Sequence, residues 1–423
     1  MRQIPENSSQ INKKPLSEAN RTLKPKWYRN YFGFMQQIPQ NISQTKESNI
    51  SEINKKPLSE ASRTLKPKWY RCYIEPKQLR FLSQRSDLQG LFQAVGHLSL
   101  WVITGTASYI LFTEHLWVGF FVALFLHGTV GVFFGAAEHE LCHGNSFKTK
   151  WLNSFFIRIF CLLSWKHFHV YKMSHGYHHR FTLHLEADRE VVLPYHPTLR
   201  FLYLLQLFTL NITGGFMSRG IIPTINQCIE IASNNFDKPM GHWKTELFAD
   251  HPKERTKAVN WARFVLAFHL LVITVSIAMG ESILAILISG HIFFGNALHY
   301  FVGTPMHIGL QSNVSDFRKC TRTITLNPLT SFLYWRMNWH IEHHMYAAVP
   351  CYNLKKLHKI VADDMPKTRS LIESWKEIRG IWKKQLKDPS YAYDTPLPPP
   401  RGKGSTDPLA ANMGDIVSRK LVS

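Results

Sequence analysis

The sequence contains few cysteines and no closely spaced cysteine pair. Six cysteines are scattered over 423 residues, and no Cys-x-x-Cys motif occurs. This distribution excludes a dense disulfide framework and cysteine-based zinc modules, and it favours a reducing, cytosol-facing environment. Residues 1–34 are polar and basic without an apolar core, so we expect no cleavable signal peptide.

Acidic residues are scarce relative to basic ones. The chain has 29 Asp and Glu against 50 Lys and Arg, which gives a net charge of +21. Such a charge suits either nucleic acid or the anionic face of a membrane. The sequence has no zinc finger, RNA-recognition signature or basic zipper. Long apolar runs favour the membrane, and nucleic acid is not expected as a partner.

Four apolar runs are long enough to cross or nearly cross a bilayer, which takes about 20 residues. Very short connections pair them into two hairpins, residues 91–112 with 116–135 and residues 262–280 with 282–301. The weaker run at 151–165 is interrupted by an arginine, and we expect an interfacial or buried helix there. We therefore predict an all-α membrane protein with two transmembrane helical hairpins, four spans in total, and a helical cap.

Hairpins return the chain to its starting side, so residues 1–90, 136–260 and 302–423 share one side. These regions hold nearly all Lys and Arg, whereas the two tight turns hold none. The positive-inside rule then places the cap in the cytosol. A second weak run, residues 199–216, contains an asparagine and two glycines and is also expected to be interfacial or buried.

A tandem duplication occupies the N-terminal part of the chain. Residues 11–31 return as residues 53–73, and only Asn20/Ser62 and Asn30/Cys72 differ. Two copies are too few for a solenoid, which needs about three repeats. The basic and aromatic stretch at 66–71 is expected either to bind lipid headgroups or to be solvated.

Three regions are predicted from these patterns. Residues 1–88 lack apolar periodicity and are expected to be a largely disordered, basic extension. Residues 89–380, which contain the four apolar runs, are expected to form the membrane domain. Residues 381–423 contain Pro, Gly and Ser and are expected to be a flexible tail.

Three histidine clusters lie beside the apolar runs. Their spacings are i, i+4 in the first cluster and i, i+3, i+4 in the other two, so each cluster can direct its rings at one spot. Neutral imidazole is a common ligand of zinc, copper and iron. Eight clustered imidazoles exceed what one ion needs, which predicts a two-ion site at the membrane surface. The eight are His139, His143, His175, His178, His179, His340, His343 and His344.

Two other kinds of protein fit part of this pattern. His139-Glu140-x-x-His143 is also the zinc metalloprotease motif, in which Glu140 would be the general base. A protease needs only one further ligand, so six more clustered histidines would be unexplained. A metal transporter would place its ligands near the bilayer midplane, whereas these clusters lie outside the runs.

The three clusters resemble the histidine boxes of the membrane fatty acid desaturase/hydroxylase superfamily. The boxes His-x(3)-His, His-x(2)-His-His and His-x(2)-His-His are intact and in order. Asn327-Pro328-Leu329 and the stretch from Val349 to His358 resemble the flanks of the third box. The resemblance covers about residues 90–375 and is most specific from 300 to 358.

The resemblance implies a non-haem centre of two iron ions that uses O₂ to remove hydrogen from an unactivated C–H bond. A lipid acyl chain is the expected substrate and desaturation the expected reaction; hydroxylase or ketolase activity, on an acyl chain, a sphingoid base or a carotenoid, is the alternative. The chain lacks the His-Pro-Gly-Gly haem motif, so an external cytochrome b5 or ferredoxin would supply electrons. An integral membrane location follows, in the endoplasmic reticulum of a eukaryote or the plasma membrane of a bacterium.

The resemblance also implies a ninth histidine near the end of the last span. His307 fits best, although Met306 stands where the family has an acidic residue, and His299 is the alternative. Polar residues beside the ligands are candidates to hydrogen-bond the imidazole N–H groups. These candidates are Glu138, Glu140, Asn338 and Glu342.

Overall fold

The computed structural model describes residues 58–191, 197–214, 220–236 and 243–398. All of them belong to one compact unit, Ile53–Ser423. Within these ranges the structure is helical apart from one parallel pair of two-residue strands, β1 (Ile324–Thr325) and β2 (Arg369–Ser370). The prediction of an all-α protein is confirmed.

The helical elements follow one another along the chain with connections of different lengths. In order they are α3 (Leu58–Thr64), α4 (Pro76–Leu82), α5 (Asp87–Thr113), α6 (Trp117–Val132), α7 (Phe134–Cys142), α8 (Lys150–Leu163), α9 (Phe168–Phe181), α10 (Phe201–Phe208), α11 (Ile221–Ala232), α12 (Trp243–Leu247), α13 (Pro252–Ala278), α14 (Ser282–Ala285), the π-helical turn η1 (Ile286–Gly290), the 3₁₀ turn η2 (His291–Phe293), α15 (Ala297–Gly303), the 3₁₀ turn η3 (Thr304–Met306), α16 (Phe317–Cys320), α17 (Pro328–Leu333), α18 (His340–Met345), the 3₁₀ turn η4 (Cys351–Asn353), α19 (Leu354–Val361), the 3₁₀ turn η5 (Ala362–Asp364) and α20 (Leu371–Gln385).

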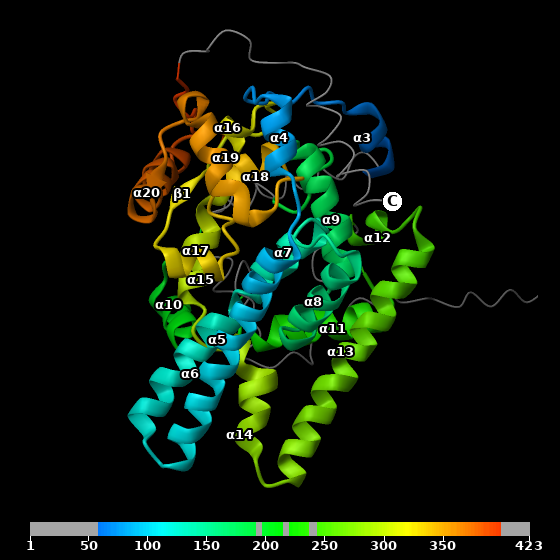
Figure 1. Cartoon of the computed structure of the whole chain (residues 1–423), viewed down its shortest axis with the longest axis vertical. Helices are drawn as coiled ribbons and strands as arrows, with labels where there is room; N and C mark the ends of the chain where they lie inside the picture. The colour runs from blue at the N-terminus through cyan, green and yellow to red at the C-terminus, as the bar shows by residue number, and fades with distance from the viewer. Residues whose placement is uncertain (1–57, 192–196, 215–219, 237–242, 399–423) are drawn as a thin grey trace, which may run out of the picture. The chain divides into compact units, whose positions relative to one another are not determined.

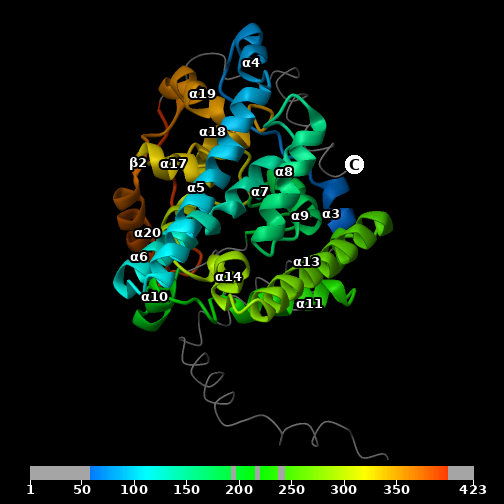
Figure 2. The ribbon, with the colours of Figure 1, turned by 60° about the horizontal axis from the view of Figure 1, so that its bottom comes forward.

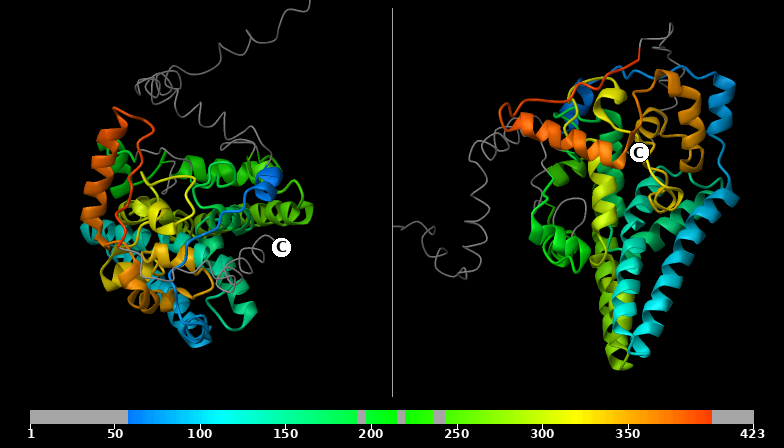
Figure 3. Two further views of the ribbon diagram at one scale, coloured as in Figure 1. Left: turned by 90° about the horizontal axis from the view of Figure 1, so that it is seen from above. Right: turned by 90° about the vertical axis from the view of Figure 1, so that its left-hand side faces the viewer.

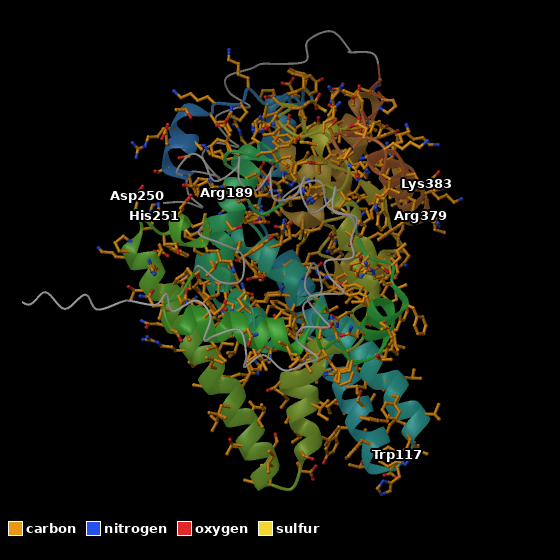
Figure 4. All side chains as sticks on the ribbon, turned by 180° about the vertical axis from the view of Figure 1, so that it is seen from behind. Trp117, Arg189, Asp250, His251, Arg379 and Lys383 are labelled. Carbon is orange, nitrogen blue, oxygen red and sulfur yellow. The ribbon has the colours of Figure 1, made fainter. Side chains whose placement is uncertain are left out.

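Two helical hairpins, α5–α6 and α13–α14, project from the same side of a helical cap (Figure 1; Figure 3, right). Trp117 lies at the far tip of one hairpin, whereas Arg379 and Lys383 of α20 lie in the cap (Figure 4). Many large apolar side chains on the hairpins are exposed, Val118 at 82% and Leu270 at 66% among them. Exposed apolar surface of this kind is typical of helices that contact lipid.

Three of the described helices are long and apolar enough to cross a membrane: Asp87–Thr113, Trp117–Cys142 and Pro252–Ala278. The fourth predicted span is not one continuous helix. After the shorter apolar segment Ser282–Phe293, the backbone becomes extended at Phe294, and Gly295 has a φ of +60°. Two hairpins and a cap are therefore present, and the last span is broken where it enters the cap.

Side chains from α6 and from the connection between α8 and α9 pair with backbone carbonyls of this irregular segment. His127 Nε2 lies 2.9 Å from the Leu287 carbonyl, and Trp165 Nε1 donates to the Ser289 carbonyl at 2.8 Å. Thr129 Oγ1 donates to the Gly295 carbonyl at 2.9 Å. Irregular backbone at membrane depth is tolerated only when it is paired within the protein. A Cβ on Gly128 would lie 2.4 Å from the Phe294 carbonyl oxygen, so only glycine allows this close approach.

The weaker apolar run at 151–165 is largely helical, as predicted, whereas in the run at 199–216 the described residues are helical only over Phe201–Phe208. Helix α8 covers the first run, and α10 begins the second. Helix α11 lies along α13 (Figure 2). The connection between α8 and α9 passes close to both α13 and the broken segment, because Trp165 stacks on His269 at 3.8 Å.

The second copy of the N-terminal repeat packs against the cap instead of extending from it. Trp69 stacks on Phe317 at 4.0 Å, and Trp69 Nε1 donates to the Arg180 carbonyl at 3.0 Å. The Cys72 side chain is 1% exposed, and its sulfur lies 3.7 Å from the Met345 sulfur. The expectation of disorder was therefore wrong for residues 58–88. For residues 1–57 this expectation lies outside the described part of the chain. The expected flexible tail is wrong for residues 381–398, because α20 continues to Gln385 and the Tyr393 N–H donates to the Gly309 carbonyl at 2.8 Å; the tail beyond residue 398 lies outside the described residues.

Candidate metal centre

The three boxes and His307 come together as two adjacent groups of buried histidines. Helix α7 and its C-cap supply the first box, α9 the second and α18 the third, and His307 follows η3. Within each group the candidate ligand atoms all lie within 4.8 Å of one another. The group of five is His139, His143, His175, His179 and His343, and the group of four is His178, His307, His340 and His344.

Helical geometry explains how the boxes divide between the two groups. In α9, His175 and His179 are one turn apart and join the group of five, whereas His178 joins the group of four. In α18, His340 and His344 join the group of four, and His343 joins the group of five. The i, i+4 pair shares one face of a helix and the i+3 position is rotated from it. The expectation that each cluster directs all its rings at one spot is wrong for these two boxes.

The ring nitrogens have the spacing of ligands that share an ion. His307 Nε2 and His340 Nε2 are 3.0 Å apart, and His343 Nε2 and His179 Nε2 are 3.1 Å apart. Two nitrogens that each lie about 2.1 Å from one ion are separated by about 3 Å at a right angle. Buried His139 Nε2, both ring nitrogens of His143, and His175 Nε2 have no hydrogen-bond partner among the described residues. Iron, as an imidazole-binding metal, fits this donor set.

One ring nitrogen of most of these histidines is held by the protein, which fixes the other toward its group. Glu140 Oε1 lies 3.1 Å from His139 Nδ1 and 3.3 Å from His343 Nδ1. His307 Nδ1 lies 2.9 Å from the Cys320 carbonyl oxygen. In the third box, His344 Nδ1 lies 3.0 Å from Thr182 Oγ1. A bonded Nδ1 leaves Nε2 available to a metal.

Two carboxylates that orient the second box were not predicted from the sequence. Asp188 Oδ2 lies 2.8 Å from His178 Nδ1, and Glu190 Oε1 lies 3.1 Å from His175 Nδ1. Both acids follow the box within 15 residues, on the loop after α9. An acidic pair so soon after the second box is the only sequence signal that could have indicated them.

Burial and mutual repulsion keep most of these imidazoles neutral. Burial lowers the pKa of His143 to about 3 and that of His307 to about 3. For His178, burial acts in the same direction, but Asp188 more than offsets it, so the pKa of His178 is raised. A carboxylate-supported imidazole is a more basic ligand, and neutral rings need lose no proton when a metal binds.

The four polar residues predicted beside the ligands have different surroundings. Only Glu140 is seen in contact with two clustered histidines. Glu342 accepts from Thr323 Oγ1 at 2.6 Å and pairs with His358. Asn338 links α17 to β1, because it accepts from Ser331 and donates to the Ile324 carbonyl. Glu138 lines a cavity beside the centre.

This cavity has a volume of about 360 Å³ and reaches both histidine groups. Helices α6, α7, α9, α11 and α15 contribute to its walls. Its lining includes His139 and His178, one from each group, and apolar side chains such as Val132 and Met337. His299 also lines the cavity but belongs to neither group, so the structure favours His307 as the ninth clustered histidine.

A cavity beside paired, buried histidine groups, at the cap end of the apolar helices, is typical of a membrane metalloenzyme. The family model for fatty acid desaturases matches residues 115–375, and the chain belongs to this family. The family identifies the chain as an oxidoreductase that acts on fatty acids in a membrane context. A search of curated proteins found no match.

Proposed function

We propose that the protein catalyses O₂-dependent desaturation of a lipid acyl chain at a centre of two histidine-bound iron ions. The observation that carries the proposal is the pair of buried histidine groups that share one cavity. His139, His143, His175, His179 and His343 would hold one ion, and His178, His307, His340 and His344 the other. When bound, the iron pair would activate O₂ for removal of hydrogen from an unactivated C–H bond.

The protein's own contribution is orientation and exclusion of water. The nine histidines are all buried, His343 at 0% exposure, so their rings are rigid and shielded from solvent. Glu140, Asp188 and Glu190 fix ring tautomers by accepting from Nδ1. A dry, preorganised site protects a reactive centre from side reactions.

An external donor such as cytochrome b5 or a ferredoxin would supply the electrons. The chain lacks a His-Pro-Gly-Gly haem motif, and its net charge of +21 suits an acidic donor protein. The positive-inside rule supports a cytosolic cap, in the endoplasmic reticulum of a eukaryote or the plasma membrane of a bacterium. The catalytic domain on this proposal comprises residues 89–380.

The zinc protease alternative has little support. Its general base would be Glu140, but that carboxylate lies against two imidazoles of the group of five. Which of desaturation, hydroxylation and ketolation occurs would depend on where the reacting C–H bond lies relative to the irons. Product analysis therefore has to separate these reactions.

Expression in a host with a simple lipid profile, followed by mass spectrometry of its fatty acids and sphingolipids, tests the reaction. A new double bond is expected; a new hydroxyl or keto group would replace desaturase by hydroxylase or ketolase. Metal analysis tests the centre. The purified wild type is expected to contain about two irons per chain, and His178→Ala and His343→Ala are each expected to lose iron and activity.

The matched control is His169→Ala, which changes a histidine of the same helix as His178 that belongs to neither group. This variant is expected to keep its iron. One zinc per chain in the wild type would contradict the iron centre. Retention of iron and turnover in both His178→Ala and His343→Ala would contradict the assignment of the ligands.

A further inference from the structure

One lysine in the cavity wall has no place in the chemistry described above. Lys166 lies in the connection between α8 and α9 and lines the cavity. A Cβ on Gly135 would lie 3.4 Å from the Lys166 ammonium nitrogen and 4.0 Å from His299 Nε2. The ammonium group and the His299 ring therefore converge over the first turn of α7.

Hydrogen bonds hold the backbone around Lys166, so the fold determines the direction of the Lys166 side chain. Trp165 has a φ of +56°, and its ring donates to the Ser289 carbonyl at 2.8 Å. The Lys166 N–H donates to the Cys161 carbonyl at 2.9 Å, and Trp261 Nε1 donates to the Lys166 carbonyl at 2.9 Å. A left-handed turn held on both sides points the side chain into the cavity.

The Lys166 ammonium makes no hydrogen bond or ion pair within the described ranges. Glu138, Glu190 and a second lysine, Lys244, also line this cavity. Nearby lining groups include the apolar side chains of Val132 and Ala136. A cation that faces a largely apolar cavity is stabilised by an anion that enters with the ligand.

Gly135 and His139 limit how far such an anion lies from the histidine groups. The two residues are one turn apart on α7, which corresponds to about 6 Å along the helix axis. His139 belongs to the group of five. A ligand whose anionic group contacts Lys166 therefore brings only its first few carbons, about six at most on this helical spacing, beside the centre.

We propose that the Lys166 ammonium binds the anionic group of the acyl substrate, and that this contact places carbons near that group, rather than the middle of the chain, beside the histidine groups. This inference rests on the proposed function, because it takes the cavity to be the acyl site. The anion is a carboxylate or a phosphate, which are the acidic groups that acyl lipids carry.

Binding of defined probes to the purified, iron-loaded full-length protein in detergent tests the contact. The probes are palmitate, hexadecyl phosphate and the neutral hexadecanol, each measured by equilibrium dialysis of radiolabelled ligand. The wild type is expected to bind at least one of the two anions about tenfold or more tightly than hexadecanol, as a charge-assisted hydrogen bond allows. The tighter of the two anions identifies a carboxylate or a phosphate as the natural group.

Lys166→Met is expected to lower the affinity for the anionic probes about tenfold and to leave hexadecanol binding and iron content unchanged. Lys166→Arg is expected to keep the preference for the anionic probes over hexadecanol. Lys150→Met, at the exposed start of α8, is the matched control and is expected to bind all three probes like the wild type. Equal affinities in the wild type, or an unchanged preference in Lys166→Met, would overturn the contact.

The position of the product's new functional group tests the second half of the proposal. A double bond or hydroxyl within about six carbons of the anionic end is expected from the helical spacing. A product modified in the middle of the chain would overturn the placement. An iron-free wild type would instead contradict the proposed function, and the probe affinities would still decide the role of Lys166.

Discussion

Asp188→Asn is expected to weaken iron binding, to lower the stability of the fold, or both, while it preserves the shape of the site. The buried carboxylate accepts three hydrogen bonds: Oδ2 from His178 Nδ1 at 2.8 Å and from the Leu183 N–H at 2.8 Å, and Oδ1 from the Glu190 N–H at 3.0 Å. Asparagine has the same shape but offers one acceptor, the carbonyl oxygen, and one donor, the NH2 group. At least one of the three donors therefore loses its acceptor.

The size of the effect follows from which donor is lost. If the NH2 group of asparagine faces His178, iron affinity should fall about 10- to 100-fold, which is the usual effect of losing the hydrogen-bond acceptor of a metal-binding histidine. That range corresponds to about 1.4 to 2.8 kcal/mol. If the NH2 group instead faces Glu190, the buried Glu190 backbone N–H loses its acceptor, which costs about 1 to 3 kcal/mol of stability. Because Oδ2 holds both His178 and Leu183, the first arrangement disturbs two bonds and the second only one.

Iron content after competition with chelators of graded strength measures the first effect, and thermal unfolding measures the second. The control is Asp394→Asn, because Asp394 is 64% exposed in its ion pair with Lys319 and should contribute nothing to either quantity. If Asp188→Asn bound two irons with wild-type affinity and unfolded at the wild-type temperature, the orienting role of Asp188 would be refuted.

Three further perturbations separate the contributions of other parts of the chain. His307→Ala is expected to lose about one iron per chain and His299→Ala none, as metal analysis would reveal; the reverse result would make His299 the ninth ligand. A chain that begins at Met35 is expected to keep wild-type activity, because the second repeat copy, whose Trp69 and Cys72 pack against the cap, is retained; loss of turnover would assign a role to the first copy. Trp69→Ala is expected to cost about 2 kcal/mol, less than a fully buried tryptophan, and to lower the Tm; an unchanged Tm would contradict the packing role of the segment.

Local spacing explains why much of the centre was predictable from the sequence. The i, i+4 separation of His139 and His143 places both rings on one side of any helix, whatever surrounds it. The hairpins were predictable for a similar reason, because apolar runs of about 20 residues joined by very short turns leave one arrangement in a bilayer. Asp188 and Glu190 were not, because their contacts depend on how the loop after α9 folds back. A carboxylate in a loop has no periodicity that indicates its partner.

The break in the last span and the packing of the second repeat copy were also beyond reach from the sequence alone. A continuous apolar run predicts a continuous helix, but here His127, Thr129 and Trp165 from other parts of the chain pair with its carbonyls. The repeat copy lacks apolar periodicity, yet Trp69 finds a flat aromatic partner in Phe317. In both cases tertiary contacts override the local preference.

The division of the boxes between the two groups makes the centre a single mechanical unit. Helix α9 contributes His178 to one group and His175 to the other, and α18 contributes His340 and His343 in the same alternating way. A small rotation of either helix would therefore move ligands in both groups at once, whereas loss of one ring affects one group directly. Rigid packing of these two helices, not only the presence of the histidines, is thus required for two ions to bind with a fixed separation.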